Sequence, residues 1–256
     1  MIDKINVAST DSLTVEETYS LEASTLQFTG SDDDSHDVVV PEYLHKTYYW
    51  SYLNPRNVSW LDRELIVKLV LWWQHNKLRK AAFLEITPSS SVLQVAAVYG
   101  DFSQQLSEHI GTNGELKLID VAPVQVDNTR LKLTDYPYVE VYQADAATIK
   151  DKEYDVVLCY FLLHEIPDEY KTKVIDNLLN HIKTDGKLVI VDYHKPHWAH
   201  PIKPITSIVF DLLEPYAKTL WQQSIRSLAS EPEHYKWKYS NYFGGLFQKI
   251  VVTKKC

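Results

Sequence analysis

Residues 92–101, "VLQVAAVYGD", place a short aliphatic run directly before a turn, and this stretch decides the fold. The aliphatic run is typical of a buried strand. A turn at this point of a nucleotide-binding domain normally carries glycines, because the backbone must approach the ligand closely. Here Ala96 and Val98 take the early turn positions, and only Gly100 remains. The stretch therefore predicts the first strand of a βα unit whose ligand-binding turn is altered.

Candidate strands and helices alternate after this turn. The expected strands are 91–98, 115–120, 138–143, 154–161 and 186–192, and the expected helices between them are 101–110, 123–134 and 168–183. Alternation with connections of this length favours a parallel sheet with helices on both faces.

The flanking segments extend this pattern. Apolar periodicity predicts a helix over 59–84, and a long helical region follows the fifth strand at 203–229. The stretch "YKWKYSNYFGGLFQKIVVTKK" (235–255) predicts a hairpin around Gly244 and Gly245. We therefore predict an α/β fold: a doubly wound, mostly parallel seven-stranded sheet with a terminal antiparallel hairpin. Class I S-adenosylmethionine (SAM)-dependent methyltransferases have this arrangement.

The charge is distributed unevenly along the chain. Residues 1–40 hold nine acidic residues and one basic residue, whereas the whole chain has a net charge of −8, so residues 41–256 are formally neutral. The acidic, Ser/Thr-rich segment 1–40 is predicted to be a disordered tail. Residues 41–256 are predicted to form a single SAM-binding domain that begins with a helical lid. No basic stripe indicates a nucleic-acid partner.

The cysteine content and the apolar runs indicate in which cellular compartment the protein is expected. The two cysteines, Cys159 and Cys256, do not form a disulfide framework, which suits a reducing environment. No apolar run approaches the roughly 18 residues that a bilayer span requires, and no signal peptide is expected. The expected location is therefore cytoplasmic.

Polar groups follow the first three predicted strands, where an open α/β sheet binds its ligand. Asp120 ends "GELKLID" (114–120), where a carboxylate can accept both ribose hydroxyls of SAM. Asp145 in "ADAA" (144–147) can accept the adenine amino group, and Ala146 can supply a backbone N–H. The alternative is that both are ordinary loop acids. With an upstream arginine and an aromatic residue of the fourth strand, the predicted cofactor set is Arg56, Gln94, Ala96, Tyr99, Gly100, Asp120, Val121, Asp145, Ala146 and Tyr160.

Six motifs give a narrower resemblance over about residues 40–253. They are "YLNPRNVSWLDR" (52–63), "VLQVAAVYGDFS" (92–103), "LIDVAPVQVDNTRLKL" (118–133), "CYFLLHEIP" (159–167), "VIVDYHKPHWAHPIK" (189–203) and "NYFGGLFQKIVV" (241–252). As an ordered set they resemble the rhodoquinone-biosynthesis methyltransferase-like family and, more distantly, the ubiquinone/menaquinone C-methyltransferases. Gln94 stands where methyltransferases usually carry an acid, and Ala96 and Val98 where they carry glycine.

The resemblance implies a reaction other than methyl transfer. A methoxy group of ubiquinone is replaced by an amino group, with SAM as the nitrogen donor and Mn²⁺ as a helper. The altered turn is then a mark of the family. The implied substrate is a polyprenyl quinone, which implies peripheral contact with the inner face of the quinone-bearing membrane.

Acidic and imidazole groups follow the fourth and fifth strands, which are neighbours in this fold. The predicted catalytic residues are His164, Glu165, Tyr193 and His194, and the predicted metal ligands are His164, Asp192, His194 and His197. Manganese prefers carboxylate, imidazole and water ligands and can polarise a quinone carbonyl. A histidine can instead be the base that frees an ammonium group for attack. The alternative is a rigid loop with ordinary hydrogen-bonded histidines.

Two aromatic segments each allow two interpretations. Segment 43–60 can close over the cofactor, with Arg56 binding its carboxylate, or can be a packing helix. "LVLWWQHNKLRKAAF" (69–83) can lie in a membrane interface or pack into the core.

Two further functions stay open beside amino transfer. One is a conventional SAM-dependent methyltransferase acting on a quinol or phenol. The other is a catalytically inactive protein that binds SAM, which the altered turn favours and the acid–imidazole cluster disfavours.

Overall fold

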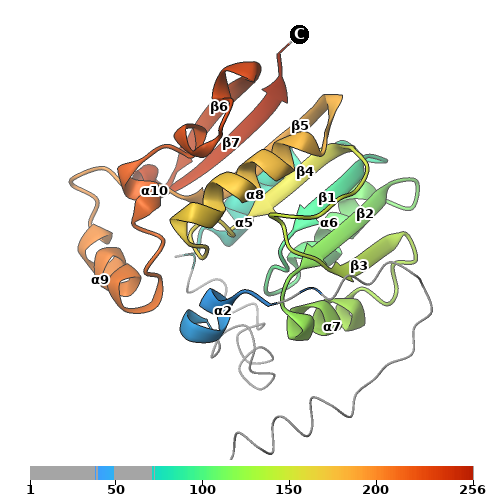
Figure 1. Cartoon of the computed structure of the whole chain (residues 1–256), viewed down its shortest axis with the longest axis horizontal. Helices are drawn as coiled ribbons and strands as arrows, with labels where there is room; N and C mark the ends of the chain where they lie inside the picture. Colours follow the sequence, from blue (N-terminus) through green and yellow to red (C-terminus); the bar gives the residue numbers. More distant parts are fainter. Residues whose placement is uncertain (1–37, 39, 49–70, 72, 256) are drawn as a thin grey trace, which may run out of the picture. The chain divides into compact units, whose positions relative to one another are not determined.

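A sheet of seven strands, in the order β3-β2-β1-β4-β5-β7-β6, organises the described part of the chain (Figure 1). The computed structural model describes residues 38, 40–48, 71 and 73–255. The strands are β1 (Ser91–Val95), β2 (Glu115–Asp120), β3 (Val139–Gln143), β4 (Tyr154–Tyr160), β5 (Ile182–Tyr193), β6 (Tyr235–Tyr242) and β7 (Phe247–Lys254). Strands β1 to β5 pair in parallel, while β7 is antiparallel to β5 and β6 antiparallel to β7.

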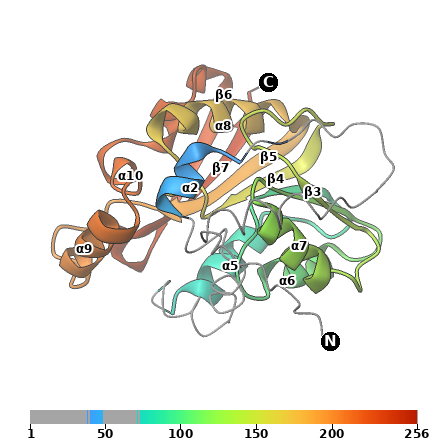
Figure 2. The ribbon, with the colours of Figure 1, turned by 60° about the horizontal axis from the view of Figure 1, so that its bottom comes forward.

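Helices connect the strands and cover the sheet (Figure 2). The α-helices described are α2 (Glu42–Thr47), α5 (His75–Phe83), α6 (Phe102–Ile110), α7 (Pro123–Lys132), α8 (Asp168–Asn180), α9 (Lys203–Leu213) and α10 (Thr219–Gln222). Three short 3₁₀ turns are η2 (Ile225–Leu228), η3 (Pro232–His234) and η4 (Phe243–Gly245). The doubly wound α/β prediction and its terminal hairpin are confirmed.

Two buried clusters lie on opposite faces of the sheet. In β1, Leu93 and Val95 belong to one cluster and Val92 to the other, because alternate side chains of a strand point to opposite faces. The first cluster includes apolar residues of α8, and the second includes those of α5 and α6. Burial on both faces explains why these strands are continuous apolar runs.

The hairpin turn depends on its two glycines. Phe243, Gly244 and Gly245 all have positive φ, a region in which glycine carries no steric cost. A Cβ atom at Gly244 would collide with the ring of His200. The turn therefore packs directly against the loop that follows β5.

Two predicted helices differ from the observed ones. The region 203–229 breaks into α9, α10 and η2, since Pro215 disfavours a helical conformation at Glu214, which has φ −131° and ψ 67°. In the region 59–84, an α-helix is described only over His75–Phe83, and Trp73 has φ 59°. Residues 59–70 lie outside the described residues, as does the predicted tail apart from residues 38 and 40.

The turn after β1 keeps a glycine conformation without a glycine. Ala96 has φ 71°, whereas Val98 lies outside the left-handed region. The Ala96 N–H donates to the Ile119 carbonyl at 2.9 Å, and the Gln94 side-chain amide donates to the Ala96 carbonyl at 3.1 Å. These contacts hold Ala96 in a conformation that is unfavourable for a residue with a Cβ atom.

Replacing Ala96 by glycine should therefore stabilise the fold. Left-handed backbone costs an L-residue about 1–2 kcal/mol, and the greater freedom of glycine in the unfolded chain offsets about 0.5–1 kcal/mol. We expect A96G to raise the free energy of unfolding by about 0.5–1 kcal/mol, measured by urea denaturation. The matched control is A97G, at a position without positive φ, which should lower stability. Equal effects of the two substitutions would contradict this account.

Candidate active site

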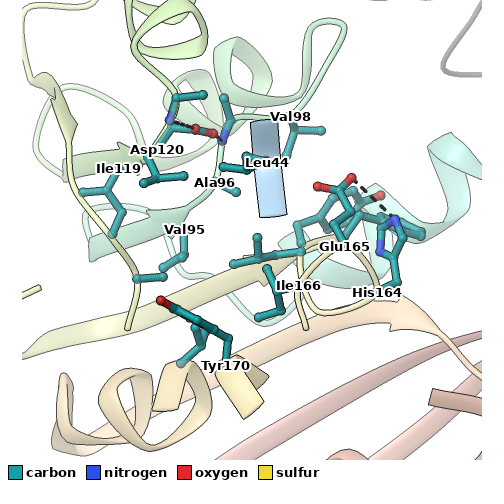
Figure 3. A pocket seen from close by; sticks show the side chains of 18 of the residues that line it. Leu44, Val95, Ala96, Val98, Ile119, Asp120, His164, Glu165, Ile166 and Tyr170 are labelled. Atoms are coloured by element: carbon teal, nitrogen blue, oxygen red, sulfur yellow. Dashed lines mark hydrogen bonds and ion pairs between the residues drawn. The ribbon is translucent and has the colours of Figure 1, made fainter. Parts of the chain in front are cut away.

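A cavity of about 230 Å³ opens at the carboxyl ends of the parallel strands (Figure 3). Of the predicted cofactor residues, those that line it are Ala96, Tyr99, Asp120, Val121, Asp145, Ala146 and Tyr160. Of the predicted catalytic residues, His164, Glu165 and Tyr193 line it as well. The structure thus brings most of both sets to one cavity.

Asp120 joins the β1 turn to the start of α7. One carboxylate oxygen accepts the Ala97 N–H and the other accepts the Ala122 N–H, both at 2.8 Å. Burial raises the pKa of this carboxyl to about 6, and the backbone N–H donors oppose that rise only in part. Each oxygen keeps acceptor capacity toward the cavity, as a ribose diol requires.

Asp145 lies at the next strand end. Its Oδ1 accepts the Ala147 N–H at 2.8 Å, and Asn177 of α8 donates to the Ala146 carbonyl at 2.9 Å. The loop is therefore fixed to α8. Asp120 and Asp145 line the same cavity from neighbouring strands.

Two predicted cofactor residues do not line the cavity. Gln94 is fully buried, and its amide also donates to Ser103 of α6 at 2.9 Å. Gly100 has φ 83°, and its carbonyl accepts from Lys132. Both residues support the turn from the side that faces away from the cavity. Arg56 lies outside the described residues.

Tyrosines line the cavity on the side of the altered turn. The Tyr99 hydroxyl is bonded to the Gln125 side chain at 2.7 Å, which fixes its position. The Tyr160 hydroxyl is buried and has no hydrogen-bond partner within the described ranges. A buried, unpaired hydroxyl at a cavity is a position where a ligand can supply the missing hydrogen bond.

A buried acid–imidazole pair closes the far side of the cavity. Asp192 is completely buried at the end of β5, and one of its oxygens lies 2.9 Å from His164 Nδ1. The same carboxylate accepts the backbone N–H of Leu163 at 2.8 Å and of Tyr193 at 2.7 Å. The other ring nitrogen of His164 lies 3.5 Å from Glu165 Oε1 (Figure 3).

These contacts determine the charge of His164. Burial alone would lower the pKa of the imidazole, but Asp192, Glu165 and Glu214 outweigh burial and raise the pKa to about 9. His164 is therefore an imidazolium at neutral pH. In this form the ring is an acid; the assignments of His164 as a catalytic residue, a base or a metal ligand stay predictions.

Two other predicted histidines do not join this cluster. His194 Nδ1 is bonded to the Gly245 carbonyl at 2.8 Å, and neither it nor His197 lines the cavity. His197 is exposed, and its backbone N–H donates to the Gly244 carbonyl at 2.9 Å. Both residues hold the loop after β5 against the hairpin turn, which is the rigid-loop alternative.

The predicted manganese ligands do not form a set that suits the ion. No group of three or more His, Cys, Asp or Glu side chains within the described ranges is arranged to hold a metal. His194 Nδ1 is bonded to the Gly245 carbonyl, and neither it nor His197 lines the cavity with His164. The four predicted ligands therefore do not form one donor set, which a manganese ion would need.

Sequence reasoning missed the acid opposite His164. Glu214 follows α9, lines the cavity and accepts a hydrogen bond from Tyr48 at 2.8 Å. Burial raises its pKa, which the charge of His164 and the Tyr48 hydroxyl oppose. Tyr48 follows α2 directly, so this bond joins two segments far apart in the chain. The one signal in the sequence was an acid before a proline, in "LLEP" (212–215).

Comparison with known proteins agrees with the geometry. Residues 92–186 match the sequence pattern of a family described as a methyltransferase domain. The ubiquinone/menaquinone biosynthesis C-methyltransferase UbiE of Idiomarina loihiensis is 32% identical over 110 residues, which cover 41% of this chain and 43% of that protein. The chain spans about half or less of the length of the relatives of this kind that it matches.

Solved structures share the fold. An O-methyltransferase family protein from Burkholderia thailandensis has a TM-score of 0.59 at 12% identity, covering 74% of this chain and 57% of its own. A SAM-dependent methyltransferase from Aquifex aeolicus has a TM-score of 0.50 at 19% identity, covering 78% of this chain and 97% of its own. The described residues thus have a class I methyltransferase fold. Within it, residues 92–186 match the methyltransferase-domain pattern, and 110 residues of the chain are similar to a quinone C-methyltransferase.

Asp120 should make SAM binding depend on pH. Ribose hydroxyls donate to the ionised carboxylate, so SAM affinity should rise as pH increases through the pKa of about 6. Between about pH 5 and about pH 7 the ionised fraction increases about tenfold, which is the expected gain in affinity. His164, with a pKa of about 9, stays protonated over this range. Calorimetric titration with SAM measures the effect.

The control is D120N, which has nearly the same shape and does not ionise. Its affinity for SAM should be lower and nearly constant over the same range. An equally steep pH dependence in D120N would place the titrating group elsewhere.

Proposed function

We propose that this chain binds SAM in the cavity and modifies the ring of a ubiquinone-type quinone. Three observations support the proposal: the methyltransferase-domain match at 92–186, the quinone named for the matching relatives, and the two acidic strand ends. The reaction we favour is the replacement of a ring methoxy group by an amino group, which would make the product a rhodoquinone. SAM is then the nitrogen donor.

The position of His164 between the carboxylates of Asp192 and Glu165, which favours its protonated form, is the observation that carries this choice. Methyl transfer to a quinol or phenol needs an electron-rich ring, and therefore a base to remove the phenolic proton. An imidazolium is an acid and polarises a quinone carbonyl, which makes the ring electron-poor and open to attack by an amine. A residue with a pKa of about 9 favours the second chemistry at neutral pH.

The cavity residues divide the proton transfers between them. Glu165 takes a proton from the amino group, whose nitrogen then attacks the methoxy-bearing carbon. His164 stabilises the negative charge that develops on the carbonyl oxygen and protonates the leaving methoxide, which departs as methanol; the neutral imidazole then takes the second proton from the nitrogen. The bond between the nitrogen and the α-carbon of SAM then breaks by elimination: a proton leaves the neighbouring methylene carbon, the nitrogen takes a proton and stays on the ring, and an unsaturated carboxylate remains attached to the sulfonium. Asp192, which is bonded to His164 but does not line the cavity, is a positioning residue.

Manganese has no part in this scheme. The resemblance implies the ion, but the predicted ligands His194 and His197 do not line the cavity, and the described residues contain no group of three or more side chains placed to hold a metal. The His164 cation supplies the positive charge that a Lewis acid would otherwise provide. No step is therefore assigned to a metal.

Conventional methyl transfer is the second candidate, because the matching relatives are named C-methyltransferases. Doubly labelled SAM separates the two reactions. The amino group carries heavy nitrogen and the methyl group carries heavy carbon. After incubation with ubiquinone, mass spectrometry should find heavy nitrogen in the quinone and one methoxy group lost. A parallel incubation uses a quinol with one unsubstituted ring carbon. Heavy carbon in its product would establish methyl transfer instead, and no change in either substrate would support the inactive SAM-binding alternative.

His164 should be required for turnover and not for SAM binding. H164Q removes the cation, and we expect turnover to fall by at least about 100-fold, the usual contribution of an acid catalyst, while SAM still binds. The wild-type rate should fall as pH rises through about 9, because only the protonated form is active. Steady-state kinetics over about pH 6–10 measures both effects.

H194Q is the comparison variant for this test. The His194 ring is bonded to the Gly245 carbonyl away from the cavity, so H194Q should retain most of the activity. Loss of turnover in H194Q comparable to that in H164Q would restore the prediction that His194 is catalytic.

A further inference from the structure

Helix α9 presents an apolar face to solvent. Thr206 and Phe210 are buried against the rest of the fold. The residues on its exposed side, which we call the α9 face, are Ile205, Ile208, Val209, Leu212 and Leu213. A surface helix normally has polar residues on this side. The α9 face is therefore apolar on the side where a surface helix is normally polar. Such an exposed apolar patch marks an interaction surface.

The charges around the α9 face are mainly positive. Asp211 is the only acid within α9, and it forms an ion pair with Lys218. The loop before the helix exposes Lys195, His197 and Trp198, the last with 81% of its surface accessible. Aliphatic residues beside tryptophan and lysine are the composition of helices that lie in the interface of an anionic bilayer.

The same helix adjoins the cavity. Its buried Phe210 packs on Tyr193, with ring centroids 4.8 Å apart, and Tyr193 lines the cavity. Glu214, directly after the helix, lines it as well. Figures 1 and 2 both place α9 at the periphery, away from the sheet. One side of the helix therefore contacts the cavity wall, and the other faces outward.

We propose that the α9 face and Trp198 dock on the surface of a lipid bilayer that contains anionic lipids. This inference rests on the proposed function, because a polyprenyl quinone is held in the bilayer. Docking through α9 brings the cavity next to the membrane, so the quinone ring reaches the cavity while its tail stays in lipid. Lys195 and Lys203 lie at the level of the lipid phosphates.

Segment 69–83, for which the sequence allowed either a membrane interface or core packing, is not the surface that we propose for membrane contact. Within the described part of that segment, Leu78 and Ala82 pack into the core, and Trp73 is exposed, as is Leu84 directly after the segment. Singly exposed apolar residues are normal on a protein surface. The α9 face is contiguous and is the stronger docking surface.

Vesicle flotation tests the proposal without SAM or quinone. The full chain is mixed with vesicles of phosphatidylcholine alone or with a third phosphatidylglycerol. We expect binding to the anionic vesicles that weakens with added salt. The double substitution I208Q/L212Q should weaken this binding by about tenfold or more, because two aliphatic side chains no longer enter the lipid.

L131Q is the matched control. Leu131 on α7 is 77% accessible and Leu212 is 75% accessible, so both substitutions replace an equally exposed leucine. L131Q should bind vesicles like the wild type. No vesicle binding by the wild type, or equal losses in L131Q and I208Q/L212Q, would overturn the proposal. A stable wild-type dimer that I208Q/L212Q dissociates in sedimentation would also overturn it, since a second copy would then cover the face.

A short-tailed, water-soluble ubiquinone separates this proposal from the proposed function. I208Q/L212Q should convert it at the wild-type rate and lose activity only on long-tailed ubiquinone in vesicles. If the wild type binds vesicles through α9 but converts neither quinone, the docking surface stands and the proposed function fails. Equal activity of both proteins on the vesicle-held quinone would overturn the docking role of α9.

No helix among the described residues is both long and apolar enough to cross a membrane.

Discussion

The buried carboxylate of Asp192 is the constraint on which the rest of the site depends. A charge removed from water needs compensation, and here two backbone N–H groups and the His164 ring provide it. These donors come from the ends of β4 and β5, so the interaction also fixes the two strand ends relative to each other. The imidazole gains its positive charge from this arrangement. Asp192 and His164 are thus one unit: without His164 the buried carboxylate would keep only its two backbone donors, and without Asp192 burial would lower the pKa of the imidazole.

A second constraint acts at the opposite side of the cavity. Ala96 keeps the left-handed conformation that a glycine adopts at low cost, and Gln94, Ile119 and Asp120 hold the turn by hydrogen bonds. The fold thus retains the path of the ligand-binding turn and adds one methyl group to it.

Local sequence patterns predicted the alternating strands and helices. They did not predict the features that depend on contacts between distant parts of the chain. The second strand was predicted at 115–120 and is Glu115–Asp120, since an apolar run between turn residues defines it locally. The convergence of His164 with Asp192 followed from the order of the strands. In contrast, Glu214 reaches the cavity only because the chain turns at Pro215 and bonds to Tyr48, 166 residues away. Nothing near His194 in the sequence indicated that its ring would bind the hairpin carbonyl instead of facing the cavity.

The order of the strands has a consequence for the newly made chain. Strand β7 lies between β5 and β6, although it is made after both. While the chain emerges from the ribosome, β5 has one open edge, and its apolar residues remain a template for pairing with other chains. Tyr193 also lacks its ring contact with Phe247 until then. The cavity wall that contains Tyr193 is therefore completed late in synthesis, and a stalled or truncated chain would expose it to aggregation.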